Sequence, residues 1–154
     1  MLSLEQRVAD RLRRCGQTLA VAESCSGGLL AHRLTNIPGS SAFFKLGVVA
    51  YSNEAKIRLL NIPREIIQRH GAVEACVAEL MAQNVRRIVP SDFGVGVTGV
   101  AGPGGGTESK PIGLVYVAVA GATKCLSRKY YFQGDRLEIK HQSGSEALKI
   151  LLEF

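Results

Sequence analysis

Residues 22–28 combine two nucleophilic side chains with a pair of glycines, a pattern that can support hydrolysis of a carbonyl compound. Ser24 could attack a carbonyl carbon while backbone N–H groups of the turn stabilise the resulting oxyanion. Cys25 is an alternative nucleophile, because a thiolate at the start of a helix has a lowered pKa, although a cysteine buried for packing is at least as common. The same turn could instead hold a phosphate or provide an ordinary serine helix cap.

A second segment, residues 97–111, places many glycines directly after an apolar run and ends at Lys110 and Pro111. Such glycines allow the backbone to approach a ligand closely. The segment is not a P-loop, because no Gly-Lys-Ser/Thr sequence follows, and it lacks the spacing and the helix of a dinucleotide-binding turn. It therefore predicts either the wall of a ligand site or a flexible connection between strands.

A third segment runs from Tyr51 to Lys56, again after an apolar run. A lysine in the first turns of a helix meets the positive end of the helix dipole, and partial burial lowers its pKa further. A lysine shifted towards the neutral amine can act as a general base. The alternative interpretation is a solvated lysine on the helix surface.

The strands predicted before these three segments cover residues 18–23, 45–51 and 92–98. If the strands run parallel, the segments meet at the edge of the sheet where α/β proteins bind ligands. A serine, a lysine and a tyrosine at that edge would form the nucleophile, base and orienting group of a Ser-Lys hydrolase.

Apolar residues at helical spacing predict helices between and after the strands. The predicted helices cover residues 4–15, 30–37 and 77–89, with short helices capped by Asn53 and started by Pro63, and a final helix capped by Asp135. The final helix is expected to carry on one side Leu137, His141, Gly144, Leu148 and Leu151.

Residues 112–120 and 124–132 predict a hairpin that adds an antiparallel pair to the sheet. Strands that alternate with helices in this way are typical of a three-layer α/β/α fold. The sequence therefore predicts an α/β protein whose mixed, mostly parallel sheet has about five strands, with residues 1–154 forming a single domain.

The composition excludes several classes of protein. The chain has 154 residues, a net charge of +6 and an ordinary hydrophobic fraction of 46%, which argues against disorder. No apolar run is long enough for a membrane span, and the charged N-terminus is unlike a signal peptide. The four cysteines are widely spaced, which argues against a zinc ribbon and favours a reducing, cytoplasmic setting. The basic residues are dispersed, so they indicate nucleic-acid binding only weakly.

Five segments, taken in order along the chain, resemble the CinA C-terminal domain family. They are residues 22–28 (AESCSGG), 38–41 (PGSS), 51–56 (YSNEAK), 70–73 (HGAV) and 99–113, with a further match at 132–136 (FQGDR). The resemblance implies a domain similar to anticodon-binding domains. It also implies the stand-alone amidase activity of the family, which hydrolyses nicotinamide mononucleotide to nicotinic acid mononucleotide and ammonia in pyridine nucleotide salvage, with neither a metal nor an organic cofactor.

The resemblance makes Ser24 the nucleophile, and Tyr51 and Lys56 the residues that activate it. The residues expected to bind substrate are Cys25, Ser26, Gly27, Gly28, Thr98, Gly99, Ala101, Gly102 and Arg136. The sequence departs from the family pattern in three places. Residues 74–76 (EAC) stand where Ser-Glu and a proline are common, Ser26 replaces a common threonine, and Lys140-His141 stands where an arginine-rich pattern is usual, with Gly144 weakening the helix after it. Expected partners are the nucleotide and a second copy of the chain in a homodimer, with neither nucleic acid nor membrane. A non-catalytic nucleotide-binding module stays the alternative function.

Overall fold

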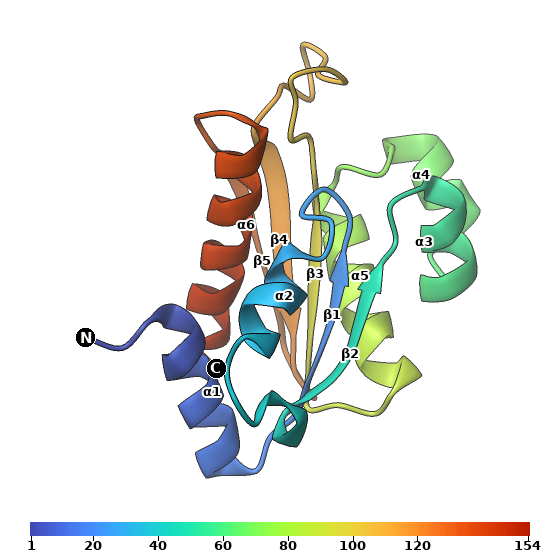
Figure 1. Ribbon diagram of the computed structural model, residues 1–154. Coiled ribbons are helices and arrows are strands. Elements are labelled where there is room, and N and C mark those ends of the chain that lie inside the picture. The colour runs from blue at the N-terminus through green and yellow to red at the C-terminus, as the bar shows by residue number, and fades with distance from the viewer.

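A five-stranded sheet forms the centre of the molecule, with strand order β2-β1-β3-β4-β5 (Figure 1). The structure is a computed structural model that describes residues 1–154. The strands are β1 (Leu19–Glu23), β2 (Phe44–Val49), β3 (Phe93–Gly99), β4 (Leu114–Ala120) and β5 (Cys125–Tyr131). The helices are α1 (Leu4–Cys15), α2 (Leu29–Thr35), α3 (Asn53–Leu60), α4 (Arg64–His70), α5 (Ala75–Ile88) and α6 (Arg136–Leu151), with a short 3₁₀ turn at Ser40–Ala42.

The sheet is mixed, as predicted. Strand β1 pairs in parallel with β2 and with β3, whereas β4 pairs antiparallel with both β3 and β5. Only β4 therefore runs against the other strands. The carboxyl ends of β1, β2 and β3 consequently lie at one edge of the sheet, at the top of Figure 1.

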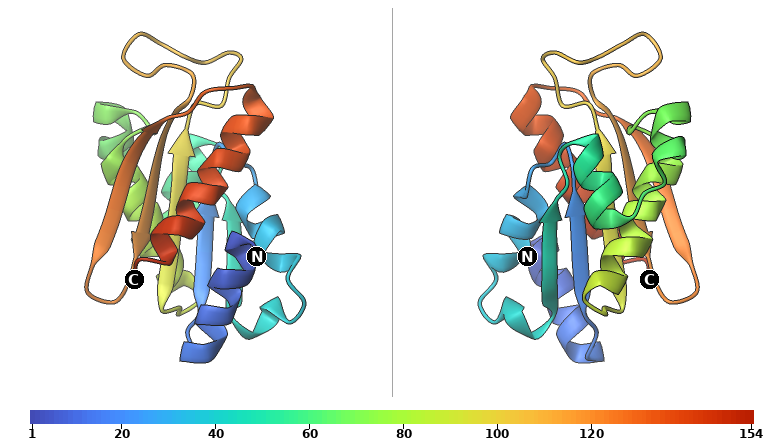
Figure 2. Two further views of the ribbon diagram at one scale, coloured as in Figure 1. Left: turned by 90° about the vertical axis from the view of Figure 1, so that its left-hand side faces the viewer. Right: turned by 90° about the vertical axis from the view of Figure 1, so that its right-hand side faces the viewer.

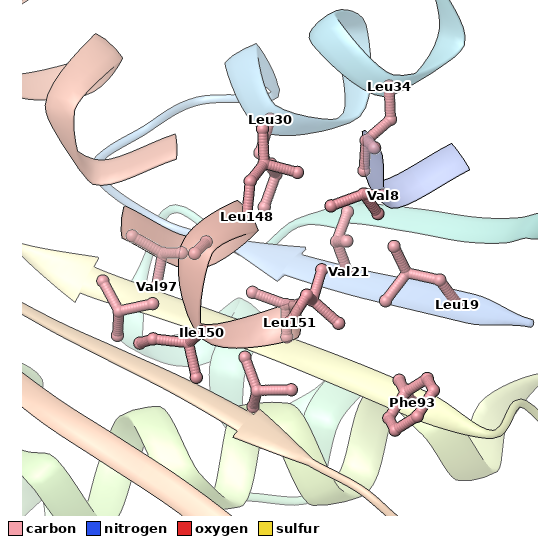
Figure 3. Packing of buried hydrophobic residues seen from close by; sticks show 14 of the residues in the cluster. Val8, Leu19, Val21, Leu30, Leu34, Phe93, Val97, Leu148, Ile150 and Leu151 are labelled. Carbon is pink, nitrogen blue, oxygen red and sulfur yellow. The ribbon is translucent and has the colours of Figure 1, made fainter. Parts of the chain in front are cut away.

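Helices cover both faces of the sheet, which confirms the three-layer α/β/α architecture (Figure 2). Helices α1, α2 and α6 lie over one face, and α3, α4 and α5 lie over the other. Alternate residues of the central strand β1 point to opposite layers, since Val21 belongs to the cluster under α6 while Ala20 and Ala22 belong to the cluster under α5. Figure 3 shows Leu148 and Leu151 of α6 within the first cluster.

Helix α5 lies unusually close to β3. A Cβ atom added at Gly94 would lie 2.0 Å from the carbonyl oxygen of Ala82, and one added at Gly96 would lie 2.2 Å from that of Ala78. Any larger residue would therefore push the helix away from the strand. Gly94 and Gly96 thus serve the packing of α5 on the sheet rather than a ligand site.

Two details of the helices differ from the sequence predictions. The side chain that caps α3 belongs to Ser52, which accepts a hydrogen bond from the Ala55 N–H, so Asn53 is the first helical residue and not the cap. In α6, Leu137 and His141 are exposed. The buried side of α6 instead begins at Ile139, because the helix is rotated so that its first turn presents this residue to the sheet. None of the helices combines the length and apolar character needed to cross a bilayer.

Candidate functional site

The three segments singled out from the sequence meet at the carboxyl ends of the strands. A cavity of about 290 Å³ opens there between the turn after β1, the end of β2, the loop after β3 and the start of α6. Its lining consists of Ser24, Cys25, Tyr51, Val73, Gly99, Val100, Ala101, Gly102, Gly104, Gly105 and Arg136. The cavity therefore brings together Ser24, Tyr51 and the glycine-rich loop, as expected, whereas Lys56 does not line it.

The turn after β1 holds Ser24 in the wall of this cavity. The Ser24 N–H donates to the carbonyl oxygen of Val97 in β3 (2.9 Å), so the turn is fixed to the centre of the sheet. Gly27 and Gly28 have φ angles of +60° and +95°, which only glycine adopts easily and which reverse the chain into α2. The Ser24 side chain is 8% exposed, and the N–H groups of Cys25 and Ser26 donate to no other group of the protein. The turn thus offers a hydroxyl beside two unpaired donors.

Glu23 is a site residue that the sequence interpretation missed. Its buried carboxylate accepts hydrogen bonds from the N–H groups of Leu30 (2.9 Å) and Ala31 (3.0 Å), while its backbone oxygen accepts one from Ala50 (2.9 Å). Helix α2 has glycine at its N-cap, so Glu23 replaces the missing capping side chain. The signal in the sequence is an acid four residues ahead of two glycines, after which the helix begins.

Cys25 is buried directly after Ser24, and its burial raises the pKa of its thiol to about 12. A thiol in this state is protonated at neutral pH and is a weak nucleophile. The structure therefore favours the packing interpretation of Cys25, although part of the residue lines the cavity.

Lys56 is not the solvated lysine of the alternative interpretation. Only 2% of it is exposed, and its Nζ donates to the backbone oxygen of Tyr51 at 3.3 Å. Burial lowers the pKa of the amine, because the charged form loses its hydration. The Ser24 hydroxyl and Lys56 share no hydrogen bond.

Tyr51 and Arg136 form a bridge across the mouth of the cavity. The exposed Tyr51 hydroxyl accepts a hydrogen bond from Nη2 of Arg136 (2.6 Å), and Nη1 of Arg136 donates to the carbonyl oxygen of Gly102 (2.5 Å). Arg136 is the first residue of α6, whose N-terminus is fixed by a capping box at Asp135. The expected phosphate-binding arginine therefore stands between the tyrosine and the glycine-rich loop.

Four residues expected to bind substrate do not line the cavity, namely Ser26, Gly27, Gly28 and Thr98. The Thr98 hydroxyl donates to the carbonyl oxygen of Ala72 (2.9 Å), and the Lys140 ammonium lies over Gly27. The side chain of Ser26 is fully buried, with no hydrogen-bond partner for its hydroxyl. These residues lie close to lining residues in the chain and support the cavity wall without forming part of it.

Known proteins resemble this chain over nearly its whole length. A CinA-like protein of Syntrophus aciditrophicus is 48% identical over 99% of the chain, and one of Geotalea uraniireducens is 49% identical over 90%. The chain covers 36% and 33% of these two proteins, so it spans about a third of the length of the curated relatives that it matches. The crystal structure of a competence/damage inducible protein from Agrobacterium tumefaciens superposes with a TM-score of 0.95 at 38% identity, covering 97% of this chain and 92% of that one.

The family assignment does not depend on these individual relatives. The sequence pattern of the CinA C-terminal domain matches residues 1–154, which include every segment that meets at the cavity. This chain therefore belongs to the CinA C-terminal domain family.

Proposed function

We propose that the chain is an amidohydrolase that converts nicotinamide mononucleotide to nicotinic acid mononucleotide and ammonia, with Ser24 as the nucleophile. The observation that carries the proposal is that Ser24 lines the cavity and is followed by the unpaired N–H groups of Cys25 and Ser26. The site also has a buried amine, Lys56, whose lowered pKa suits a general base.

The first half of the reaction forms an ester. Ser24 Oγ attacks the carboxamide carbon, and its proton passes to the neutral amine of Lys56. Catalytic hydrogen bonds often tighten only when substrate binds, so the missing contact between Ser24 and Lys56 in the free protein is compatible with this step. The N–H groups of Cys25 and Ser26 stabilise the oxyanion, an effect of roughly 3 kcal/mol for each donor. Lys56 then returns the proton to the nitrogen as the C–N bond breaks, and ammonia leaves.

The second half removes the nicotinoyl group from Ser24. Water attacks the ester carbon while Lys56 takes one of its protons. The C–O bond to Ser24 then breaks as Lys56 returns that proton to Ser24 Oγ, which releases the acid and restores both side chains. Tyr51 assists by accepting the hydrogen bond of Arg136 and by fixing Lys56 through its backbone oxygen.

Arg136 and the glycine-rich loop are proposed to bind the phosphate. The guanidinium uses one N–H on Tyr51 and one on Gly102, and it retains further N–H donors for an anion. The backbone N–H groups of Ala101, Gly104 and Gly105 make no hydrogen bond within the protein, and these residues line the cavity. Backbone donors of this kind are a common way to hold phosphate.

A non-catalytic nucleotide-binding module is the second candidate, and the missing hydrogen bond between Ser24 and Lys56 favours it. The two candidates differ in one assay. Purified protein is incubated with nicotinamide mononucleotide, nicotinamide riboside and nicotinamide, and both ammonia and the acid product are measured. Ammonia released in equal amount with nicotinic acid mononucleotide supports the amidase, whereas saturable binding of the nucleotide without ammonia supports the binding module.

The cellular location and the oligomeric state are also proposals. None of the four cysteines forms a disulfide, which suits a reducing cytoplasm. A homodimer is proposed because β2 and β5 are both open edge strands, and sedimentation of the purified chain tests it. Nucleic acid and membranes are not expected as partners.

A further inference from the structure

We propose that Lys110 is a positioning residue that holds two walls of the cavity together and thereby sets the affinity for substrate. The predicted effect on substrate affinity rests on the proposed amidase function. The predicted effect on the two loops does not depend on that function. One wall is the glycine-rich loop, residues 100–113, and the other is the loop of residues 71–74 between α4 and α5.

The contacts of Lys110 all cross from the first loop to the second. Its Nζ donates to the backbone oxygens of Val73 (2.7 Å) and His70 and lies 3.4 Å from a carboxylate oxygen of Glu74. The ammonium therefore has three oxygen partners that stand 36–40 residues away in sequence. Charge-assisted bonds of this type are about twice as strong as neutral ones.

A small turn presents Lys110 for these contacts. The Thr107 N–H donates to the Lys110 carbonyl oxygen (2.9 Å), and the Lys110 N–H donates to the Thr107 hydroxyl (3.0 Å). Between this turn and β3, residues 101–106 make no backbone hydrogen bond of their own as donors, and the one side chain that binds their carbonyls is Arg136. Within residues 103–110, the hydrogen bonds that reach another part of the protein are consequently those of the Lys110 side chain.

The second loop contributes directly to the cavity through Val73. Thr98 fixes the carbonyl oxygen of Ala72, so the middle of this loop is anchored to β3. Lys110 fixes its two ends, at His70 and at Glu74. The position of Val73 relative to Gly104 and Gly105 on the opposite wall therefore depends on Lys110. Glu74, which departs from the family pattern, has its role in this ion pair.

The structural part is tested by limited proteolysis with a glutamate-specific protease. Glu108 lies exposed in the glycine-rich loop, and the half-buried Glu74 lies in the other loop, so each wall has its own cleavage site. Lys110→Met is expected to raise the cleavage rate at both sites roughly tenfold, because both loops open once their shared contact is lost. The matched control is Lys45→Met, which removes the same charge from an exposed position on β2 that has neither a hydrogen bond nor an ion pair. It should leave both rates unchanged.

The kinetic part uses the same variants with nicotinamide mononucleotide. Lys110→Met is expected to raise KM about tenfold while kcat stays within about threefold, because the loosened walls weaken binding rather than chemistry. Lys110→Arg retains donors for the carbonyl oxygens. On a logarithmic scale, its KM and both of its cleavage rates should lie closer to the wild-type values than to those of Lys110→Met.

Three results would overturn the inference. The first is unchanged cleavage at both glutamates in folded Lys110→Met, and the second is a lower kcat and lower melting temperature with unchanged KM, which would indicate a merely structural role. If Lys110→Met does not fold, Glu74→Gln replaces it, and we expect this variant to be cleaved two to three times faster at Glu108. The third contradicting result would be an unchanged cleavage rate at Glu108 in Glu74→Gln. Failure of the amidase proposal looks different, because the wild type would then release no ammonia while the proteolysis results would still stand.

Discussion

The glycines of β3 and the glycines of the loop that follows it show two opposite uses of the same residue. Gly94 and Gly96 have no free space, because backbone oxygens of α5 lie where a side chain would begin. Gly104 and Gly105, a few residues later, have nothing within 4 Å of an added Cβ. The first pair brings a helix onto the sheet, and the second pair leaves room beside Ser24 for something that is not protein.

The same contrast holds for polar groups in the two regions. Where α5 packs on the sheet, Ala78 and Ala82 lie in a cluster with apolar residues of β4, and the backbone of β3 is paired with its neighbours in the sheet. At the cavity, several N–H groups have no partner, and the Lys56 amine is buried with one hydrogen bond to the backbone of Tyr51, a lining residue. A buried polar group with too few partners reduces stability unless a ligand uses it, so this difference is the one expected if the cavity binds a ligand as proposed.

The largest expected effect is the loss of activity in Lys56→Met. Removal of a general base lowers kcat by about 10²–10⁴-fold. The melting temperature should stay equal or rise, because a buried amine that must lose its hydration is replaced by an apolar side chain of similar length. Ammonia release and thermal unfolding of the same preparation check both parts. A variant that loses activity only because it unfolds would contradict the proposed role.

The pH dependence of the wild type sharpens this prediction. Lys56 acts as the neutral amine, so kcat should rise with pH through its lowered pKa. Stability should rise in the same direction, because the unfolded chain, in which the lysine pKa is about 10.5, binds more protons than the folded chain between the two pKa values. Urea unfolding at several pH values in that range gives the free energy of unfolding at each pH. This free energy should rise less steeply with pH in Lys56→Met than in the wild type, and an equal rise in both proteins would contradict the lowered pKa of Lys56.

On the packing side, Gly96→Ala should destabilise the protein without a direct effect on the site. The new methyl group collides with backbone of α5, and over-packing of this kind destabilises by about 2–3 kcal/mol. For a chain of this length the expected fall in melting temperature is roughly 5–10 °C. KM of the remaining folded protein should be unchanged. A normal melting temperature would mean that α5 can move away from β3.

Cys25 gives a smaller effect and distinguishes the two nucleophiles. Cys25→Ala should retain activity within about tenfold, since the thiol is protonated and the change removes only packing. In the native wild type, iodoacetamide at neutral pH should modify the exposed Cys15 and spare Cys25, as peptide mass analysis would show. Loss of activity as complete as that of Ser24→Ala would instead favour the thiol.

The smallest effect on stability is expected for Gly104→Ala, the counterpart of Gly96→Ala. An added methyl group meets no atom, so the free energy of unfolding should change by less than about 0.5 kcal/mol. KM for the nucleotide should rise a few-fold, because Gly104 lines the cavity. A change in stability as large as that of Gly96→Ala would remove the distinction between the two pairs of glycines.

Much of the fold and part of the site follow from the sequence alone. The strands are short apolar runs, and a ligand site in such a fold lies after the strands, so Ser24, Tyr51 and the glycine-rich loop could be placed together. The positions of Lys56 and Arg136 in the chain were predicted, but their surroundings were not. Burial of an amine and the bridge from Arg136 to Tyr51, 85 residues away, depend on how the elements pack.

Other features could not be predicted because they join distant segments. The pairing of Lys110 with the loop around Val73 has no local pattern, and α6 carries enough apolar residues on two sides that its rotation is decided by the sheet. Glycines 94 and 96 fall within a predicted strand, but only the position of α5 shows why no side chain fits there.

The central claim is that Ser24 is the nucleophile of an amidase, and the most direct test is the rate of ammonia release from nicotinamide mononucleotide by Ser24→Ala beside the wild type. The account predicts that the wild type forms nicotinic acid mononucleotide and ammonia in equal amounts. The variant should keep its melting temperature and lose at least about 10³-fold in kcat, the scale seen when a nucleophile is removed. A folded Ser24→Ala protein that releases ammonia at the wild-type rate would contradict the account.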